Sequence, residues 1–478
     1  MTTPPATPPS TIEKIETGVP GLDILTYGGV PRGRATLITG KSGTCKSILG
    51  LQIAAHQAQL GRPALLLTAE EEPDDFRITG NALGLNVSDL CERRLLHIAN
   101  VATPMEGPTM VLGEFDVTGL IHRIEQAVRQ YQIQVLVLDS TTALFSHPTS
   151  QAELRAQFFQ LIYALRRLSL TAIIISEAPS DYGPLTTLGV EDFVCDMVLV
   201  LRNVIDGERR RRSLEVHKYR RSPHYKGQFP CTMTSRGLTV FPLDAQGRER
   251  VRPTERYSSG IPGLDAMNNG GWIRDAIVLV RGPSGSGKTT LAGMYARAGA
   301  LRGERVIYYG FEETKLMLLR NFGSLGMAME EFEQAGNLRV VCRYPEATSP
   351  EDMLVDIRNG LDQFRPSLVV LDSISSVEHS TSPLGFRQFM IGLASLLREH
   401  GRSALLIETV SAIDDPKVEA PFLSTIPDVI LLLDHRWQGK HRLRTIRVHK
   451  MRGSAHDMEE HVLTIVPGGL RVDPLARD

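Results

Sequence analysis

The residue types that bind nucleotide phosphates occur together in one stretch of the second half of the chain. The run GPSGSGKT, Gly282–Thr289, fits the pattern GxxxxGK[ST] at every fixed position and follows an apolar run. In such a loop, backbone N–H groups close around the phosphates, the lysine reaches the β- and γ-phosphates, and the hydroxyl of Thr289 binds Mg²⁺. The alternative is a Gly/Ser-rich surface turn that happens to precede a lysine. The context favours an ATP site formed by Gly282, Pro283, Ser284, Gly285, Ser286, Gly287, Lys288, Thr289 and Thr290.

The first half carries a similar loop, GKSGTCKS, with one departure. Cys45 stands where the pattern has the glycine before the lysine, and its Cβ occupies room that a close phosphate needs. Lys46 and Ser47 supply the phosphate and Mg²⁺ ligands, so we expect binding to survive, while turnover stays open. A thiol of lowered pKa beside Lys46 is one reading of Cys45; a small residue tolerated in a first helical turn is the other. The predicted ATP-binding residues are Gly40, Lys41, Ser42, Gly43, Thr44, Cys45, Lys46 and Ser47.

Acidic residues follow apolar strands in both halves. Glu70-Glu71 and Glu312-Glu313 each end such a strand, and adjacent glutamates at a strand end are ordinarily a solvated turn. Here the offset between Glu70 and Glu312 equals that between the two loop lysines, which favours a catalytic role as general base. Asp139 and Asp372 end the runs QVLVLDS and SLVVLDS, as Walker B aspartates that hold Mg²⁺ do.

The repeated order of motifs predicts a duplicated domain rather than a solenoid. Short apolar strands alternate with helix-length amphipathic stretches such as Ala152–Leu168, which is typical of α/β proteins. We expect tandem RecA-like P-loop NTPase domains, each with a mostly parallel central sheet and helices on both faces, and with the loop, the glutamates and the aspartate on neighbouring strand ends. The predicted parts are a disordered tail (1–12), a first domain (13–247) and a second domain (248–478), with the boundary in QGRERVRPT.

Composition excludes several classes of function. The 478 residues have a net charge of −1, which does not favour nucleic acid or a membrane surface as a partner. The run Glu208–Arg212 is read as a solvated turn between two strands. Five scattered cysteines without zinc or redox spacing fit a reducing cytoplasm, and no stretch resembles a transmembrane span or a signal peptide.

Several further motifs make the chain similar to the KaiC family, the circadian-clock ATPases and autokinases. They are GVPGLD followed by GGVPRG, NVIDGERRRRSLEVHKYR, CRYPEATSPEDML, GFRQFMIGLASLLRE and VHKMRGSAHD, in the family's order from about Thr17 to Val472. The resemblance implies a two-tiered homohexamer with ATP at each subunit interface, ATPase activity, and serine/threonine autokinase and autophosphatase activity. Ser424 and Thr425 match the phosphorylated pair.

The same resemblance implies that certain residues reach ATP bound by the neighbouring subunit. The alternative is that they are ordinary charges of an edge strand. In the first half they are Lys218, Tyr219, Arg220, Ser222 and His224, and in the second half Lys450, Met451, Arg452, Ser454 and His456.

Two departures from the family bear on partners and function. The family's long C-terminal tail, which binds the activator KaiA, is absent from this sequence, and Cys45 replaces a glycine. We expect a timing or signalling hub whose partner is a KaiB-like protein, a histidine kinase or a response regulator. The alternatives are a RecA-like DNA recombinase or helicase, against which the near-zero charge and the lack of basic/aromatic interleaving argue, and a nucleotide-sensing scaffold without kinase activity.

Overall fold

The computed structural model describes residues 12–101, 117–145, 150–206, 209–243, 254–410 and 423–475. The chain divides into two compact units, Met1–Pro242 and Leu243–Asp478, and each is described by itself. The predicted tail lies almost entirely outside the described residues, and so does the segment predicted to hold the boundary.

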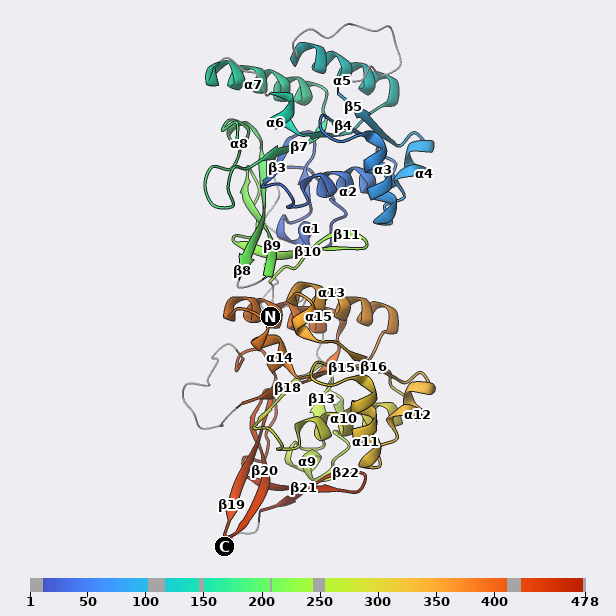
Figure 1. Ribbon diagram of the computed structural model, residues 1–478, viewed down its shortest axis with the longest axis vertical. Helices are drawn as coiled ribbons and strands as arrows, with labels where there is room; N and C mark the ends of the chain where they lie inside the picture. Colours follow the sequence, from blue (N-terminus) through green and yellow to red (C-terminus); the bar gives the residue numbers. More distant parts are fainter. Residues whose placement is uncertain are drawn as a thin grey trace. The chain divides into compact units, whose positions relative to one another are not determined.

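The first unit is built on a nine-stranded sheet with the order β11-β10-β9-β8-β3-β7-β6-β4-β5 (Figure 1). Six neighbouring strands are parallel and three at one end are antiparallel. The parallel strands are β3 (Ala35–Gly40), β4 (Ala64–Thr68), β5 (Leu96–Asn100), β6 (Val135–Asp139), β7 (Thr171–Glu177) and β8 (Met197–Asp206). The antiparallel strands are β9 (Arg209–Tyr219), β10 (Gln228–Thr234) and β11 (Gly237–Val240).

Helices cover both faces of this sheet (Figure 1). On one face, β3 and its neighbours pack against two amphipathic helices in a core that includes Leu37, Leu120, Ile174 and Phe158. The helix that follows the phosphate-binding loop packs on the other face, because its buried residues meet β4 and β6. The helices are α1 (Leu22–Leu25), α2 (Lys46–Gln59), α3 (Pro73–Ala82), α4 (Val87–Glu92), α5 (Val117–Tyr131), α6 (Thr141–Leu144), α7 (Gln151–Arg167) and α8 (Glu191–Val194). The strands β1 (Lys14–Ile15) and β2 (Val30–Pro31) form a separate two-stranded antiparallel sheet.

The second unit repeats this plan in the order β16-β15-β17-β18-β14-β19-β20-β21-β22. Its strands are β12 (Arg256–Tyr257), β13 (Trp272–Ile273), β14 (Ile277–Gly282), β15 (Val306–Gly310), β16 (Leu338–Cys342), β17 (Leu368–Asp372), β18 (Ser403–Thr409), β19 (Val429–Gln438), β20 (His441–Met451), β21 (His461–Val466) and β22 (Gly469–Pro474). Its helices are α9 (Pro262–Met267), α10 (Lys288–Leu301), α11 (Lys315–Ser324), α12 (Met329–Gln334), η1 (Pro345–Ala347), α13 (Pro350–Phe364), α14 (Ile374–His379) and α15 (Pro383–His400).

The predicted fold class is confirmed, and one detail of it is wrong. The strand that ends in the glutamate pair neighbours the strand that ends in the aspartate, as expected. The strand that leads into the phosphate-binding loop does not neighbour the strand that ends in the aspartate. In the first unit β7 lies between β3 and β6, and in the second unit β18 lies between β14 and β17. The aspartate therefore reaches the loop across one intervening strand.

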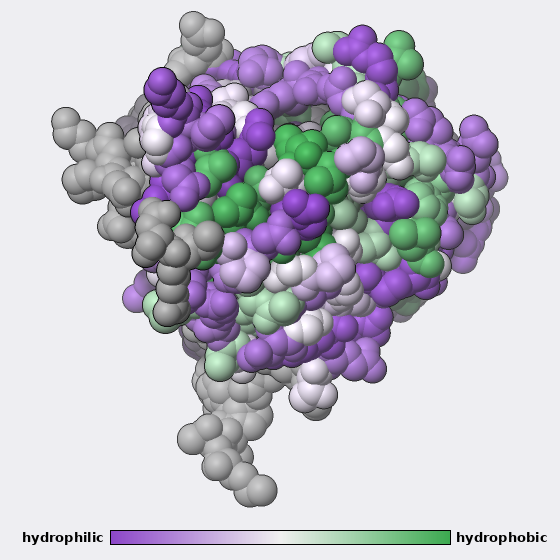
Figure 2. Space-filling model, turned by 90° about the horizontal axis from the view of Figure 1, so that it is seen from below, coloured by the Kyte–Doolittle hydropathy of each residue, from purple (hydrophilic) through white to green (hydrophobic). Residues whose placement is uncertain are grey.

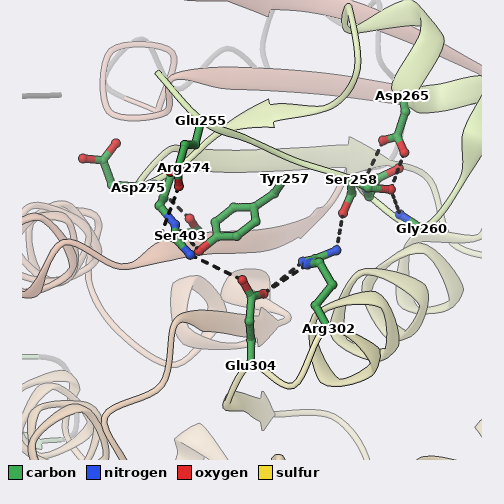
Figure 3. Close-up of polar contacts among 11 residues, drawn as sticks. Glu255, Tyr257, Ser258, Gly260, Asp265, Arg274, Asp275, Arg302, Glu304 and Ser403 are labelled. Carbon is green, nitrogen blue, oxygen red and sulfur yellow. Dashed lines mark hydrogen bonds and ion pairs between the residues drawn. The ribbon is translucent and has the colours of Figure 1, made fainter. Parts of the chain in front are cut away.

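The start of the second unit is fastened by an aromatic ring between two cations (Figure 3). The guanidinium carbons of Arg274 and Arg302 lie 4.9 and 5.1 Å from the centre of the Tyr257 ring. Glu304 pairs with both arginines, at 3.5 Å from Arg274 and 3.1 Å from Arg302. Arg302 also donates to the carbonyl of Ser258, at 3.1 Å. Residues 256–258 are thus tied to the C-terminal end of α10.

The surface is mixed in polarity. On the face drawn in Figure 2, hydrophilic residues surround smaller groups of hydrophobic ones. No helix among the described residues is long and apolar enough to cross a membrane.

Candidate nucleotide sites

The phosphate-binding loop of the second unit joins the buried strand β14 to α10. Gly287 has φ +100°, the left-handed conformation that glycine adopts without strain, and it lets the chain turn into the helix. Gly282 is needed for another reason, since a Cβ there would lie 2.5 Å from the carbonyl oxygen of Leu433. The ammonium of Lys288 donates to the carbonyl of Pro283, at 2.8 Å. Burial lowers the pKa of Lys288, and Asp372 and Glu312 partly oppose this.

The loop of the first unit has the same shape despite Cys45. Cys45 lies at φ +74°, and Lys46 donates to the carbonyl of Lys41 at 2.9 Å. At the matching Gly287 of the second unit, an added Cβ would make a tight contact with a Leu463 methyl, at 3.3 Å. Burial raises the pKa of the Cys45 thiol, although the charge of Arg212 opposes the shift, which favours the reading of a tolerated small residue over that of an activated thiolate.

Each Walker B aspartate meets the hydroxyl that ends its loop. The hydroxyls of Ser47 and Thr289 lie close enough to Asp139 and Asp372, respectively, to lower the pKa of these carboxyls. Burial is the largest cause that raises the pKa of each aspartate to about 6. In the second unit the hydroxyl of Tyr308 also donates to Asp372, at 2.6 Å.

These groups fit a magnesium ion held with a nucleotide. Asp139 Oδ2 is buried and has no hydrogen-bond partner within the described part of the chain. Mg²⁺ is ordinarily held by one or two carboxylates together with phosphates and water. The described residues contain no group of three or more His, Cys, Asp or Glu side chains suited to a metal ion.

One glutamate of each pair faces the loop lysine. The hydroxyl of Ser140 donates to Glu70, and in the second unit Ser373 and Ser376 donate to Glu312, the latter at 3.2 Å. The charge of Glu70 raises the pKa of Lys46, and the charge of Glu312 raises the pKa of Lys288.

The other glutamate of each pair has a different environment. Glu313 accepts a hydrogen bond from Asn321, at 2.9 Å. Burial and the charge of Asp75 raise the pKa of Glu71. The geometry therefore distinguishes Glu70 and Glu312 from their neighbours, which the sequence alone left undivided.

The residues expected to act on a neighbour's ATP lie at the other end of the sheet in the first unit. Tyr219 pairs with Met197, which pairs with Thr36 at the start of β3, whereas the phosphate-binding loop follows the end of β3. Four residues of strand separate these ends, a distance of about 13 Å. Lys218 and Arg220 donate to the carbonyls of Asp192 and Phe193, at 2.5 and 2.8 Å.

The remaining residues of this set surround that edge. Tyr219 is buried and donates to the carbonyl of Gly29, at 3.1 Å. The hydroxyl of Ser222 donates to the carbonyl of Pro223, at 2.9 Å. Burial lowers the pKa of His224.

The second unit repeats the arrangement and adds two hydroxyl side chains. Met451 pairs with Val429 near the start of β14. Lys450 donates to the carbonyl of Ser424 at 2.6 Å, and Arg452 donates to that of Thr425 at 2.7 Å. Both Ser424 and Thr425 are exposed. They occupy the places of Asp192 and Phe193, so the first unit has no hydroxyl there.

The last two residues of the second set lie beside this edge. Ser454 accepts a hydrogen bond from Arg256, at 2.6 Å. The ring of His456 lies 3.5 Å from the carbonyl of Ser454.

Several residues near the loops escaped sequence reasoning. They are Ser140, Ser373 and Ser376, which hold the glutamates; Tyr308, on Asp372; Glu177, whose charge raises the pKa of Lys46; and His435 and Arg444, which contact the carbonyls of Ser284 and Gly285. The repeated Asp-Ser dipeptide was the one available signal. The others come from strands that are distant in the sequence.

Comparison with known proteins gives consistent matches over nearly the whole chain. A family model described as "ATPase: KaiC" matches residues 15–245 and, a second time, residues 257–477. The "Circadian clock protein KaiC3" of Synechocystis sp. is 38% identical over 464 residues, covering 96% of this chain and 92% of the relative. The "Circadian clock oscillator protein KaiC" of Picosynechococcus sp. is 36% identical over 463 residues, covering 96% and 90%. The protein of that name from Nostoc sp. is 37% identical over 448 residues, covering 93% and 86%.

Proposed function

Because the chain belongs to the KaiC family of ATPases, we propose that it is an ATPase and serine/threonine autokinase that works as a homohexamer with ATP between subunits. In this proposal the first unit hydrolyses ATP, and the second transfers the γ-phosphoryl group to Ser424 and Thr425. The names of the relatives refer to a circadian clock and support a role in timing. Our proposal also includes a signalling role and a location in the cytoplasm. We include a KaiB-like protein or a two-component signalling protein as the partner class.

One observation carries the proposal. The two hydroxyls and the cations Lys450 and Arg452 lie at the edge of the sheet opposite to the phosphate-binding loop of the same unit. This separation supports transfer to Ser424 or Thr425 from ATP held by another copy of the chain. Cations supplied across that interface would stabilise the charge of the transferring phosphoryl group.

The chemistry divides among the residues of two subunits. Backbone N–H groups of residues 282–289 and Lys288 bind and orient the phosphates, while Thr289 and Asp372 would hold Mg²⁺, which supplies charge neutralisation on the phosphate oxygens. Glu312 accepts the proton of the attacking hydroxyl. The hydroxyl oxygen forms a bond to the γ-phosphorus as the bond to the β–γ bridging oxygen breaks, and ADP leaves. In the first unit Glu70 activates a water molecule in the same way.

Mass spectrometry of the Ser424–Thr425 peptide before and after incubation with Mg-ATP tests this function. Phosphate on that peptide, which disappears in the S424A/T425A variant while ATP binding persists, is the expected result. ATP-dependent hexamers without any incorporated phosphate would favour the nucleotide-sensing scaffold instead. ATP hydrolysis stimulated by single-stranded DNA would favour the recombinase reading.

A further inference from the structure

A buried ion pair lies directly beside the phosphate-binding loop of the second unit. Arg281 is the last residue before Gly282, and it is in register with Glu408 on the neighbouring parallel strand β18. Arg281 Nε lies 2.7 Å from Glu408 Oε2, and Arg281 Nη2 donates to Glu408 Oε1 at 3.3 Å. The Glu408 side chain is 4% exposed and that of Arg281 18%. The Nη2–Oε1 contact is a hydrogen bond, while the Nε–Oε2 contact is an ion pair only.

A chain of hydrogen bonds connects this pair to the glutamate that faces Lys288. The residue after Glu408 is Thr409, whose N–H donates to the hydroxyl oxygen of Ser375 at 2.8 Å. Ser375 is in α14, between Ser373 and Ser376, which both donate to Glu312. The ion pair thus joins β14, which leads into the loop, to β18. The end of β18 in turn contacts α14, whose Ser376 donates to Glu312.

The first unit has neutral residues at the matching positions. Thr39 precedes Gly40 and is in register with Ser176 on β7. Their hydroxyls donate elsewhere, that of Thr39 to the carbonyl of Leu185 and that of Ser176 to Glu191, at 2.8 Å. The chain therefore contains a natural comparison, with one loop beside a charge pair and one beside two hydroxyls.

We propose that Arg281 and Glu408 are positioning residues of the second site, whose ion pair fixes the phosphate-binding loop relative to Glu312. The proposal rests on the role given to Glu312 above. Since misplacement of a reacting group by about 1 Å can slow a reaction on the order of 100-fold, loss of the pair should reduce turnover. ATP affinity should change much less, because the loop backbone, Lys288 and Thr289 are retained.

The pair should also make the second site sensitive to pH near neutrality. Burial raises the pKa of Glu408 to about 7, with the charge of Glu378 acting in the same direction and that of Arg281 opposing it. Arg281 faces Glu408 from β14 and Glu378 from α14. Asp372 ends β17, the other strand next to β18. Its side chain lies on the opposite face of the sheet from Glu408, where it contacts Tyr308. Above pH 7 the carboxylate is charged and the pair is formed, while below pH 7 it becomes protonated and the pair is lost.

The experiment measures ATP turnover of the second site from pH 6 to 8 in the E70Q/E71Q background, with nucleotide affinity measured separately. We expect turnover to rise about 10-fold with a midpoint near pH 7. In E408Q it should stay at the low level throughout, with ATP affinity within about threefold of the parent. The same rise in E408Q would overturn the proposal, because every other titrating group is retained there.

Two further variants protect the test against misfolding and misassignment. R281T/E408S installs the neutral residues of the first unit and leaves no unpaired buried charge, so it should fold and should lose the step at pH 7; retention of the step contradicts the proposal. E312Q/E313Q in the same background examines the base. If that variant keeps full turnover, the assigned role of Glu312 fails. The comparison of the parent with E408Q across pH still tests the ion pair in that case.

Discussion

Cys45 is the residue at which the two phosphate-binding loops differ in backbone chemistry. It holds φ +74°, a left-handed conformation that costs a residue with a Cβ roughly 1–2 kcal/mol relative to glycine. The loop keeps its shape because the helix α2 and the buried Lys46 determine it. The sequence identified the replacement of glycine by Cys45 but not how it destabilises the loop. The free-energy cost comes from the positive backbone angle φ of Cys45 and not from a steric clash.

Replacing Cys45 with glycine should stabilise the first unit. Relief of the strained angle outweighs the greater flexibility of glycine in the unfolded chain, which opposes it by about 0.5–1 kcal/mol. We expect a net gain of about 0.5–1 kcal/mol in urea unfolding. The converse variant G287C should destabilise the second unit by a similar amount. A loss of stability in C45G would show that the thiol makes a contact stronger than the strain.

Asp372 should make the nucleotide-free second unit less stable as pH rises. Its pKa is raised to about 6 in the folded state, so the protonated acid favours folding at low pH, and this contribution is lost as pH rises through 6. Replacement with asparagine should therefore raise stability without nucleotide at pH 8, by on the order of 2 kcal/mol, and should weaken Mg²⁺-dependent ATP binding. Chemical denaturation at pH 5 and pH 8 measures this, and an equal effect at both values would contradict it.

At the scale of elements, the turn between a Walker B strand and its following helix holds the glutamate that we propose as the base. Ser140 begins this turn in the first unit and Ser373 in the second, and each hydroxyl donates to a glutamate that ends the neighbouring strand. Periodicity and the repeated Asp-Ser dipeptide predicted the strands and their ends from sequence. They did not predict that β18 separates the loop from the aspartate, because strand order depends on long-range packing that no local pattern records.

Removing the serine hydroxyl in the second unit should slow its chemistry. In S373A, Glu312 keeps its bond to Ser376 but loses one of two donors, so its orientation is less fixed. We expect second-site turnover to fall about 10-fold with ATP affinity nearly unchanged. S376A, whose donor is the longer one, is the matched control and should have the smaller effect. Equal activity in S373A and the parent would show that the Ser373 hydroxyl does not orient Glu312 for the reaction.

At the scale of the whole molecule, the position of the proposed acceptors favours transfer from a second copy of the chain. Ser424, Thr425, Lys450 and Arg452 share one edge of the sheet, and no local sequence pattern indicates that this edge lies away from the chain's own loop. The family resemblance supplied the assignment in advance, and the strand register supplies its physical reason. Assembly should also depend on ATP, since a ligand bound between subunits stabilises their association.

A mixing experiment tests transfer between subunits. K288A lacks a working loop in the second unit but keeps the acceptors, while S424A/T425A keeps the loop and lacks the acceptors. Each alone should incorporate little phosphate. When the two are dissociated and reassembled together with ATP, phosphate should appear on the K288A chain. Continued absence of label in mixed hexamers, verified by light scattering and mass, would show that transfer occurs within one chain.

The ring of Tyr257 between two guanidinium groups has a mechanical consequence. The contacts of Tyr257 with Arg274 and Arg302, and the ion pair of Arg302 with Glu304, connect β12 to the end of α10 (Figure 3). Helix α10 begins at the phosphate-binding loop. Part of a pull applied at residues 256–258 therefore reaches α10, while the pairing of β12 with β13 and the hydrogen bonds of Arg256 bear the rest. Single-molecule stretching of Y257A should rupture this end at a lower force.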